Sequence, residues 1–171
     1  RWVSASVPMK SVRTVRERHD VTINDVVLAA CSGALRTFLI DHGDTGIEDR
    51  VVKAMVPVSL RGTEEHGDTL GNLVSLIIVD LPVDEPDPVE RLERIHATTS
   101  ELKGSGLIDG AHRILDLVDK ATPFAGPLTR FVSRTIPMNL VITNIPGPPL
   151  PLYLCGARFV RVYPYVEVID N

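Results

Sequence analysis

The chain has 171 residues, of which 44% are hydrophobic and 23% are charged, and its formal net charge is −4. This composition is typical of a soluble globular protein, and it excludes a disordered tail, a collagen-like fibre and a coiled coil. Residues 40–120 carry 17 acidic and eight basic side chains, a net −9 that argues against a nucleic-acid partner.

The N-terminal region is predicted to contain two helices. A short basic amphipathic helix is expected over 10–19. Thr22 and Asp25 then have the T-x-x-D spacing of a capping box, which marks the start of a helix over 23–40. Because this second helix is apolar around nearly its whole circumference, we expect it to be buried against a sheet.

The middle of the chain is predicted to form two strands and a helix. The strands cover 51–60 and 72–81, and a polar, glycine-containing loop over 61–71 separates them. An acidic, proline-containing stretch then leads into a helix over 88–103. The apolar stripe of this helix is Val89, Leu92, Ile95, Thr99 and Leu102.

The remaining elements complete the prediction of the fold. Two helices are expected, and then three strands; in order they cover 107–121, 124–134, 138–143, 152–155 and 158–168. The order of elements shows no βαβ alternation and no repeat. We therefore predict an α/β fold, a two-layer sandwich in which helices pack on one face of a mixed sheet. Since the last strand runs almost to the end of the sequence, we expect the chain to be part of a longer protein.

The sequence does not predict a metal centre, a phosphate loop or a membrane span. The five histidines lie far apart, and Cys31 and Cys155 lie in apolar surroundings, so we interpret both cysteines as buried thiols in a reducing, cytoplasmic setting. The glycines near residue 70 lack the lysine of a phosphate loop. The apolar run 73–79, interrupted by Ser75, is much shorter than the roughly 20 residues that a bilayer span needs.

His112 and Asp116 have the H-x-x-x-D spacing that some acyltransferases use for a general base and its supporting aspartate. Residues i and i+4 share a helix face, so the two side chains could touch. We interpret them as an exposed helical pair, because a catalytic base also needs a pocket. No catalytic residue is therefore assigned in this chain.

Other polar candidates lie at the ends of predicted elements. Asn24 and Asp25 either stabilise the first turn of their helix, which is the preferred interpretation, or line the mouth of a cleft. Arg61 follows a strand and either binds an anionic group or is a solvated loop residue, and neither role is preferred. Asn72 and Asn144 lie at strand ends, where such side chains usually bond the turn backbone.

Four segments of the chain are recognisable together. In their order and spacing, the chain resembles the C-terminal part of the bacterial wax ester synthase/diacylglycerol acyltransferase family. The N-D pair, the P-V-S-x-R strand end, the G-N before the next strand and the N-x-P-G-P run are specific as a set. The segments are TINDVVLAACSGALRTFL, VKAMVPVSLR, LGNLVSLIIVDLP and NLVITNIPGPPLPLYLCGAR.

The resemblance implies the fold of coenzyme-A-dependent acyltransferases, in which two similar lobes enclose a tunnel. Residues 1–171 would be a single domain, most of the C-terminal lobe, with 1–20 as the inter-lobe connector and short basic helix. The resemblance also implies transfer of a fatty acyl group from acyl-CoA, a co-substrate, to diacylglycerol or a long-chain alcohol, with no further cofactor. The family's catalytic H-H-x-x-x-D-G motif is absent from this chain, so the N-terminal lobe would be the partner that supplies the catalytic histidine.

The match of motifs implies a set of substrate-binding residues along the tunnel wall: Asn24, Asp25, Ser59, Arg61, Gly71, Asn72 and Asn144. Pro151, Leu152 and Tyr153 would form a structural edge. We expect the whole enzyme to be cytoplasmic, and peripheral at the inner membrane surface or at lipid droplets. Two alternatives stay open: a non-catalytic scaffold domain with this shape, and a condensation-type domain that uses carrier-bound acyl groups.

Overall fold

The computed structural model describes residues 3–59, 74–104, 138–147, 150–161 and 163. The predicted loop over 61–71 and the predicted helices over 107–121 and 124–134 lie outside the described residues. The described elements, in chain order, are α1 (Met9–His19), α2 (Ile23–Asp41), the 3-10 helix η1 (Ile47–Asp49), β1 (Val52–Ser59), β2 (Val74–Leu81), α3 (Pro88–Gly104), β3 (Leu140–Val141), β4 (Tyr153–Leu154) and β5 (Ala157–Arg158).

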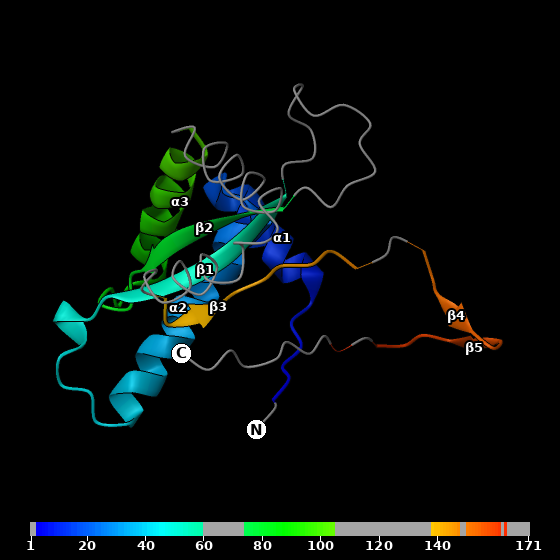
Figure 1. Ribbon diagram of the computed structural model, residues 1–171, viewed down its shortest axis with the longest axis horizontal. Coiled ribbons are helices and arrows are strands. Elements are labelled where there is room, and N and C mark those ends of the chain that lie inside the picture. The colour runs from blue at the N-terminus through cyan, green and yellow to red at the C-terminus, as the bar shows by residue number, and fades with distance from the viewer. Residues whose placement is uncertain (1–2, 60–73, 105–137, 148–149, 162, 164–171) are drawn as a thin grey trace, which may run out of the picture.

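The central sheet is mixed, as predicted, with the strand order β2-β1-β3. β1 and β2 pair antiparallel along their whole length, whereas β3 runs parallel to β1. Figure 1 shows α2 and α3 together on one face of this sheet. Alternate side chains of the strands point to that face and join the core with residues of both helices. The buried strand residues are Val52, Ala54, Val56, Ile77, Val79 and Leu81.

β3 is shorter than the predicted strand over 138–143, and Pro57 of β1 explains why. The odd-numbered residues of β1 face β3, since Asn139 donates its N–H to the carbonyl of Lys53 and Ile142 to that of Met55. Pro57 would be the next donor on this edge, but proline has no N–H. The parallel pairing therefore ends at Met55.

The prediction that α2 is buried around nearly its whole circumference is wrong. Its buried residues are Asp25, Leu28, Ala29 and Ser32, in the N-terminal half, whereas Phe38 near the C-terminal end is 54% exposed. The helix contacts α3 and β2 mainly through one side. α2 is also the helix in the described part of the chain that could cross a bilayer by length and composition alone. Its buried polar residues and its packing on α3 suit a core helix.

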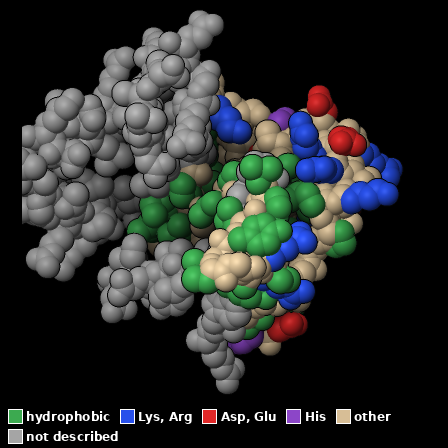
Figure 2. Space-filling model, turned by 90° about the vertical axis from the view of Figure 1, so that its right-hand side faces the viewer, with side chains coloured by type: hydrophobic (Ala, Val, Ile, Leu, Met, Phe, Trp, Pro, Cys, Tyr) green, Lys and Arg blue, Asp and Glu red, His purple; other side chains and the backbone are tan. Residues whose placement is uncertain are grey.

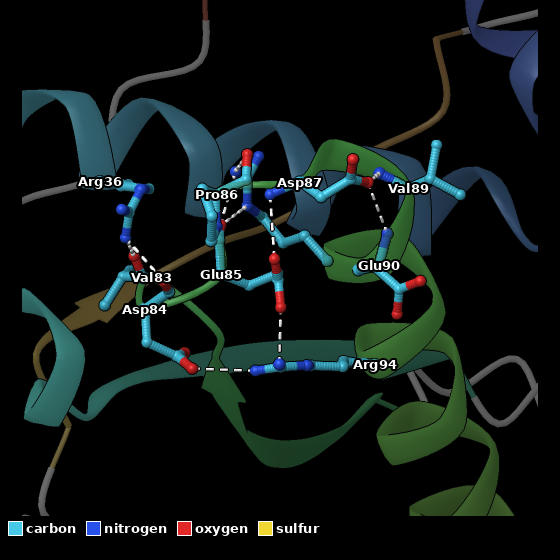
Figure 3. Close-up of polar contacts among 10 residues, drawn as sticks. Arg36, Val83, Asp84, Glu85, Pro86, Asp87, Val89, Glu90 and Arg94 are labelled. Atoms are coloured by element: carbon cyan, nitrogen blue, oxygen red, sulfur yellow. Dashed lines mark hydrogen bonds and ion pairs between the residues drawn. The ribbon is translucent and has the colours of Figure 1, made fainter.

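Arginine side chains of α2 and α3 bind the turn between β2 and α3 (Figure 3). Arg36 of α2 donates from Nη1 to the carbonyl oxygens of Val83 and Asp84, both at 2.7 Å. Arg94 of α3 forms ion pairs with Asp84 at 2.9 Å and with Glu85 at 2.6 Å. These contacts fix where α3 begins relative to α2.

Arg91 of α3 is almost fully buried, 7% exposed, and it lies on the backbone of α2 at Gly33. Its Nε and Nη2 donate to the carbonyl of Glu85, and Nη2 also donates to that of Pro86. A Cβ at Gly33 would lie 2.4 Å from Arg91 Nη1. A glycine in this helix interior therefore makes room for the guanidinium.

The C-terminal part of the described chain projects away from the sheet as a hairpin of β4 and β5 (Figure 1). Each strand has only two residues, so the predicted strands over 152–155 and 158–168 are much shorter where the structure describes them. Cys155 and Gly156 form the loop, and both have positive φ, 49° and 81°. Cys155 is exposed at this tip, so the prediction of a buried thiol is wrong for it, and Cys31 is only half-buried.

Candidate functional site

The first turn of α2 contains the capping box that the sequence predicts. The N–H of Asp25 donates to Thr22 Oγ1 at 3.2 Å, and the N–H of Thr22 donates to Asp25 Oδ2 at 2.9 Å. These two bonds satisfy donors that a helix start otherwise leaves unpaired. Asp25 thus has the structural role that was preferred for it.

The Asp25 carboxylate also connects α2 to α3. Its side chain is fully buried, and its Oδ1 accepts a hydrogen bond from Thr99 Oγ1 at 2.8 Å. Its Oδ2 lies 2.9 Å from Nδ1 of His96. Since a carboxylate oxygen can only accept, Nδ1 of His96 carries the proton. One buried carboxylate therefore has three donors, from Thr22, His96 and Thr99.

These donors decide the charge of Asp25. Burial raises the pKa of Asp25, but the hydrogen bonds from His96, Thr22 and Thr99 together lower it further, so the pKa lies below its ordinary value of 3.8. Asp25 is therefore an anion at neutral pH. A carboxylate with a low pKa and three donors is a poor proton acceptor, so Asp25 is not a suitable general base.

Two polar groups of this region have capacity left for a ligand. The side chain of Asn24 is half-buried and makes no hydrogen bond with any described residue. His96 bonds Asp25 through Nδ1, its side chain is 38% exposed, and no described residue bonds its Nε2. The candidate site is therefore the start of α2 with the adjoining side of α3.

The structure describes only some of the other predicted site residues. Ser59 ends β1, where it pairs with Val74 of β2. Asn144 is exposed after β3 and makes no hydrogen bond among the described residues. The remaining candidates lie outside the described residues, namely Arg61, Gly71, Asn72, His112 and Asp116.

Sequence reasoning missed His96 as a partner of Asp25. The available signal was that a buried carboxylate needs donors, and that Thr99 places a polar group in an otherwise apolar stripe. His96 lies three residues before Thr99 and so on the same side of α3. What the sequence lacks is the register of α3 against α2, which brings residues 71 and 74 positions apart into contact.

No metal-binding cluster of three or more His, Cys, Asp or Glu side chains occurs within the described ranges. An open hollow of about 410 Å³ lies beside the end of β2 and α3. The guanidinium groups of Arg50 and Arg94 line it, and both already bind carboxylates, Asp44 at 2.7 Å and Asp84 at 2.9 Å. Because these charges are already paired, and no predicted site residue lines the hollow, we do not place the site there.

Known proteins resemble this chain in sequence. A family model described as the WS/DGAT C-terminal domain matches residues 70–171. The whole chain is 35% identical, over 183 aligned positions, to a probable diacylglycerol O-acyltransferase of Mycobacterium tuberculosis, of which it covers 38%. It is 33% identical to the O-acyltransferase WSD of Acinetobacter baylyi, of which it covers 37%.

A solved structure resembles it as well. The wax ester synthase/diacylglycerol acyltransferase from Marinobacter aquaeolei VT8 matches 91% of this chain with a TM-score of 0.61 and 29% sequence identity. The match covers 33% of that protein. The chain therefore spans little more than a third of the length of these relatives.

Proposed function

The chain belongs to the WS/DGAT C-terminal domain family, and from this premise we propose that it forms one lobe of an O-acyltransferase. In the proposed reaction, a hydroxyl of a diacylglycerol or a long-chain alcohol attacks the thioester carbonyl of a fatty acyl-CoA. An ester bond forms, the carbon–sulfur bond breaks, and the CoA thiol leaves with the proton of the hydroxyl. The observation that carries the proposal is the 35% identity over the whole chain to a probable diacylglycerol O-acyltransferase.

In this proposal the lobe forms one wall of the substrate tunnel and supplies no general base. The catalytic histidine would come from an N-terminal lobe, as the resemblance implies. The state of Asp25 supports this division of roles, because its buried, triply bonded carboxylate cannot readily accept a proton. Asn24, the preceding residue, has an amide that no described residue bonds and that suits a polar group of the substrate.

The hairpin region supports contact with another part of the enzyme. Tyr153 and Leu154 of β4 are 61% and 64% exposed, and Val160 after β5 is 85% exposed. Figure 2, viewed from the hairpin side, shows hydrophobic side chains gathered at the middle of this face, with Lys and Arg mostly to their right. Exposed apolar groups in one region are typical of a surface that another chain or domain covers. We propose that the N-terminal lobe covers it, with Pro151, Leu152 and Tyr153 at its edge.

The whole enzyme, in this proposal, is cytoplasmic and associates peripherally with the inner membrane surface or with lipid droplets, where its acceptor lipids are found. Lipid flotation of the expressed enzyme with membranes or droplets tests this location. Recovery of all the enzyme in the lipid-free fraction would contradict it.

The reaction is tested by incubating the whole enzyme with palmitoyl-CoA and either diolein or hexadecanol, and measuring both free thiol and ester. We expect acceptor-dependent thiol release with an equal amount of ester. A scaffold domain would give neither product. A condensation-type domain would form ester or amide only when the acyl group is supplied on a carrier protein, so a parallel reaction with acylated carrier protein separates that alternative.

A further inference from the structure

His96 of α3 contacts the buried carboxylate of Asp25 at the start of α2. We propose that His96 is a positioning residue: by holding the Asp25 carboxylate, it fixes the first turn of α2 and presents the Asn24 amide to a carbonyl or hydroxyl oxygen of the substrate. The identity of that substrate rests on the proposed function. The claim that His96 fixes the first turn of α2 does not depend on the proposed function.

The geometry supports this role because the carboxylate joins two helices at one point. Within α2, Asp25 Oδ2 accepts the N–H of Thr22, which fixes the residue before the helix. From α3, His96 Nδ1 binds the same oxygen at 2.9 Å, and Thr99 binds the other oxygen at 2.8 Å. Rotation of the first turn would break bonds on both oxygens. Asn24 lies between Thr22 and Asp25 in this turn, so its position is set by the same bonds.

His96 and Thr99 both bind Asp25, but they differ in burial and therefore in the effect that we expect from removing each side chain. Thr99 is fully buried and also lies 3.2 Å from the carbonyl of His96, so it belongs to the core contact between the helices. His96 is less buried: 38% of its side chain is exposed, and it bonds the carboxylate of the residue that follows Asn24. Its removal would let water reach the carboxylate and loosen the turn on the side where a ligand could approach.

A second role for His96 must be separated from this one. A histidine with Nδ1 bound to a buried aspartate and a free Nε2 also has the arrangement of a general base. In that role Nε2 would take the proton of the acceptor hydroxyl itself, and no described residue bonds this nitrogen, so the experiment has to separate the two roles. The two roles depend on different ring nitrogens. Positioning needs the Nδ1 donor, whereas base catalysis needs Nε2.

Two substitutions separate the nitrogens. In His96→Asn, the amide nitrogen occupies the place of Nδ1 and keeps a donor toward Asp25, but nothing replaces Nε2. In His96→Leu, neither nitrogen remains while most of the volume is kept. His42→Leu is the matched control, because His42 is an exposed histidine just after α2 whose ring contacts Phe38 alone among the described residues.

The variants are compared in the whole enzyme by kcat and KM, at a temperature where each is fully folded. We expect His96→Leu to lower kcat about tenfold, since a displacement of about 1 Å can cost about 100-fold and a loosened turn costs part of that. His96→Asn should recover at least a third of the wild-type kcat, and His42→Leu should match the wild type. Equal loss in the Asn and Leu variants would overturn positioning, and so would a wild-type kcat in His96→Leu.

A second readout is independent of the reaction. The titration of the Asp25 carboxyl, followed by carbon-13 NMR of aspartate-labelled enzyme, should move to higher pH in His96→Leu and stay near the wild-type value in His96→Asn. An unchanged titration in His96→Leu would overturn the inference even if the enzyme is active. If the wild type shows no acyl transfer, the proposed function fails, and this titration still decides whether His96 holds Asp25. If His96→Leu does not fold, His96→Gln takes its place, because its longer amide cannot put a donor at the position of Nδ1.

Discussion

Replacing Gly33 by alanine should destabilise the protein, although the same change in an ordinary helix interior stabilises it. Alanine is favoured over glycine by about 1 kcal/mol in a helix. At Gly33, however, the new Cβ would lie 2.4 Å from Arg91 Nη1 and 3.2 Å from its Cζ, so the guanidinium must move. Arg91 is 7% exposed, and its guanidinium donates three hydrogen bonds to the carbonyls of Glu85 and Pro86.

The magnitude follows from those bonds. A hydrogen bond from a charged donor contributes about 1.5–3 kcal/mol, so weakening two of them costs about 3 kcal/mol or more. Subtracting the helix-propensity gain of about 1 kcal/mol leaves a net loss of about 2 kcal/mol. Urea unfolding followed by circular dichroism measures this loss as a lower midpoint at constant slope.

Two further variants test the cause. Gly104→Ala is the control, because no described residue lies within 4 Å of a Cβ at that last residue of α3, and it should be neutral or slightly stabilising. In an Arg91→Ala background, Gly33→Ala should stabilise by about 1 kcal/mol, since the obstructing group is gone. Stabilisation by Gly33→Ala in the wild-type background would refute the reasoning.

Three other predictions concern stability and reactivity. Asp25→Ala should lower the free energy of unfolding by about 2–4 kcal/mol, because it removes the capping box and the buried carboxylate that accepts hydrogen bonds from Thr99 and His96; denaturant melts measure this loss. Because the pKa of Asp25 is lowered in the folded state, the ionised carboxylate should add to the free energy of unfolding above about pH 4, and this addition should disappear as the pH falls through the folded pKa. A difference in the free energy of unfolding between wild type and Asp25→Ala that stays the same at pH 2 would contradict this. Asp20 ends α1 in the left-handed conformation, at a φ of 51°, which glycine adopts more readily than aspartate. Asp20→Gly should therefore raise the melting temperature slightly. A lower melting temperature would show that the aspartate side chain stabilises the protein by more than the backbone conformation costs. Cys155, exposed at the hairpin tip, should react with a thiol reagent faster than Cys31, whose thiol pKa is raised by burial; equal rates would contradict the difference.

The sequence predicted those helices and strands that depend on residues close to one another in the chain. The T-x-x-D spacing identified the start of α2 because capping depends on residues three positions apart. The apolar runs identified β1 and β2, and the stripe Leu92, Ile95 and Thr99 identified the buried side of α3. Val89 of the same stripe lies in the first turn of α3 and is 41% exposed, so the stripe did not predict its burial.

The features that the sequence could not predict depend on how helices and strands that are far apart in the chain pack against one another. The hydrogen-bond partners of Asp25 depend on the register in which α3 packs against α2, and no local sequence pattern determines that register. The length of β3 follows from Pro57 on a different strand, more than 80 residues earlier. Cys155 lies in apolar sequence but at a hairpin tip, so apolar neighbours in the chain did not mean burial in space.

The central claim is that this chain is one lobe of an O-acyltransferase whose general base lies elsewhere. The most direct measurement compares thiol release from palmitoyl-CoA, with diolein or hexadecanol as acceptor, for the whole enzyme and for the 171-residue chain alone. We expect acceptor-dependent release by the whole enzyme, with ester formed in equal amount, and none above background by the chain alone. Acceptor-dependent turnover by the chain alone, or its absence from the whole enzyme, would contradict it.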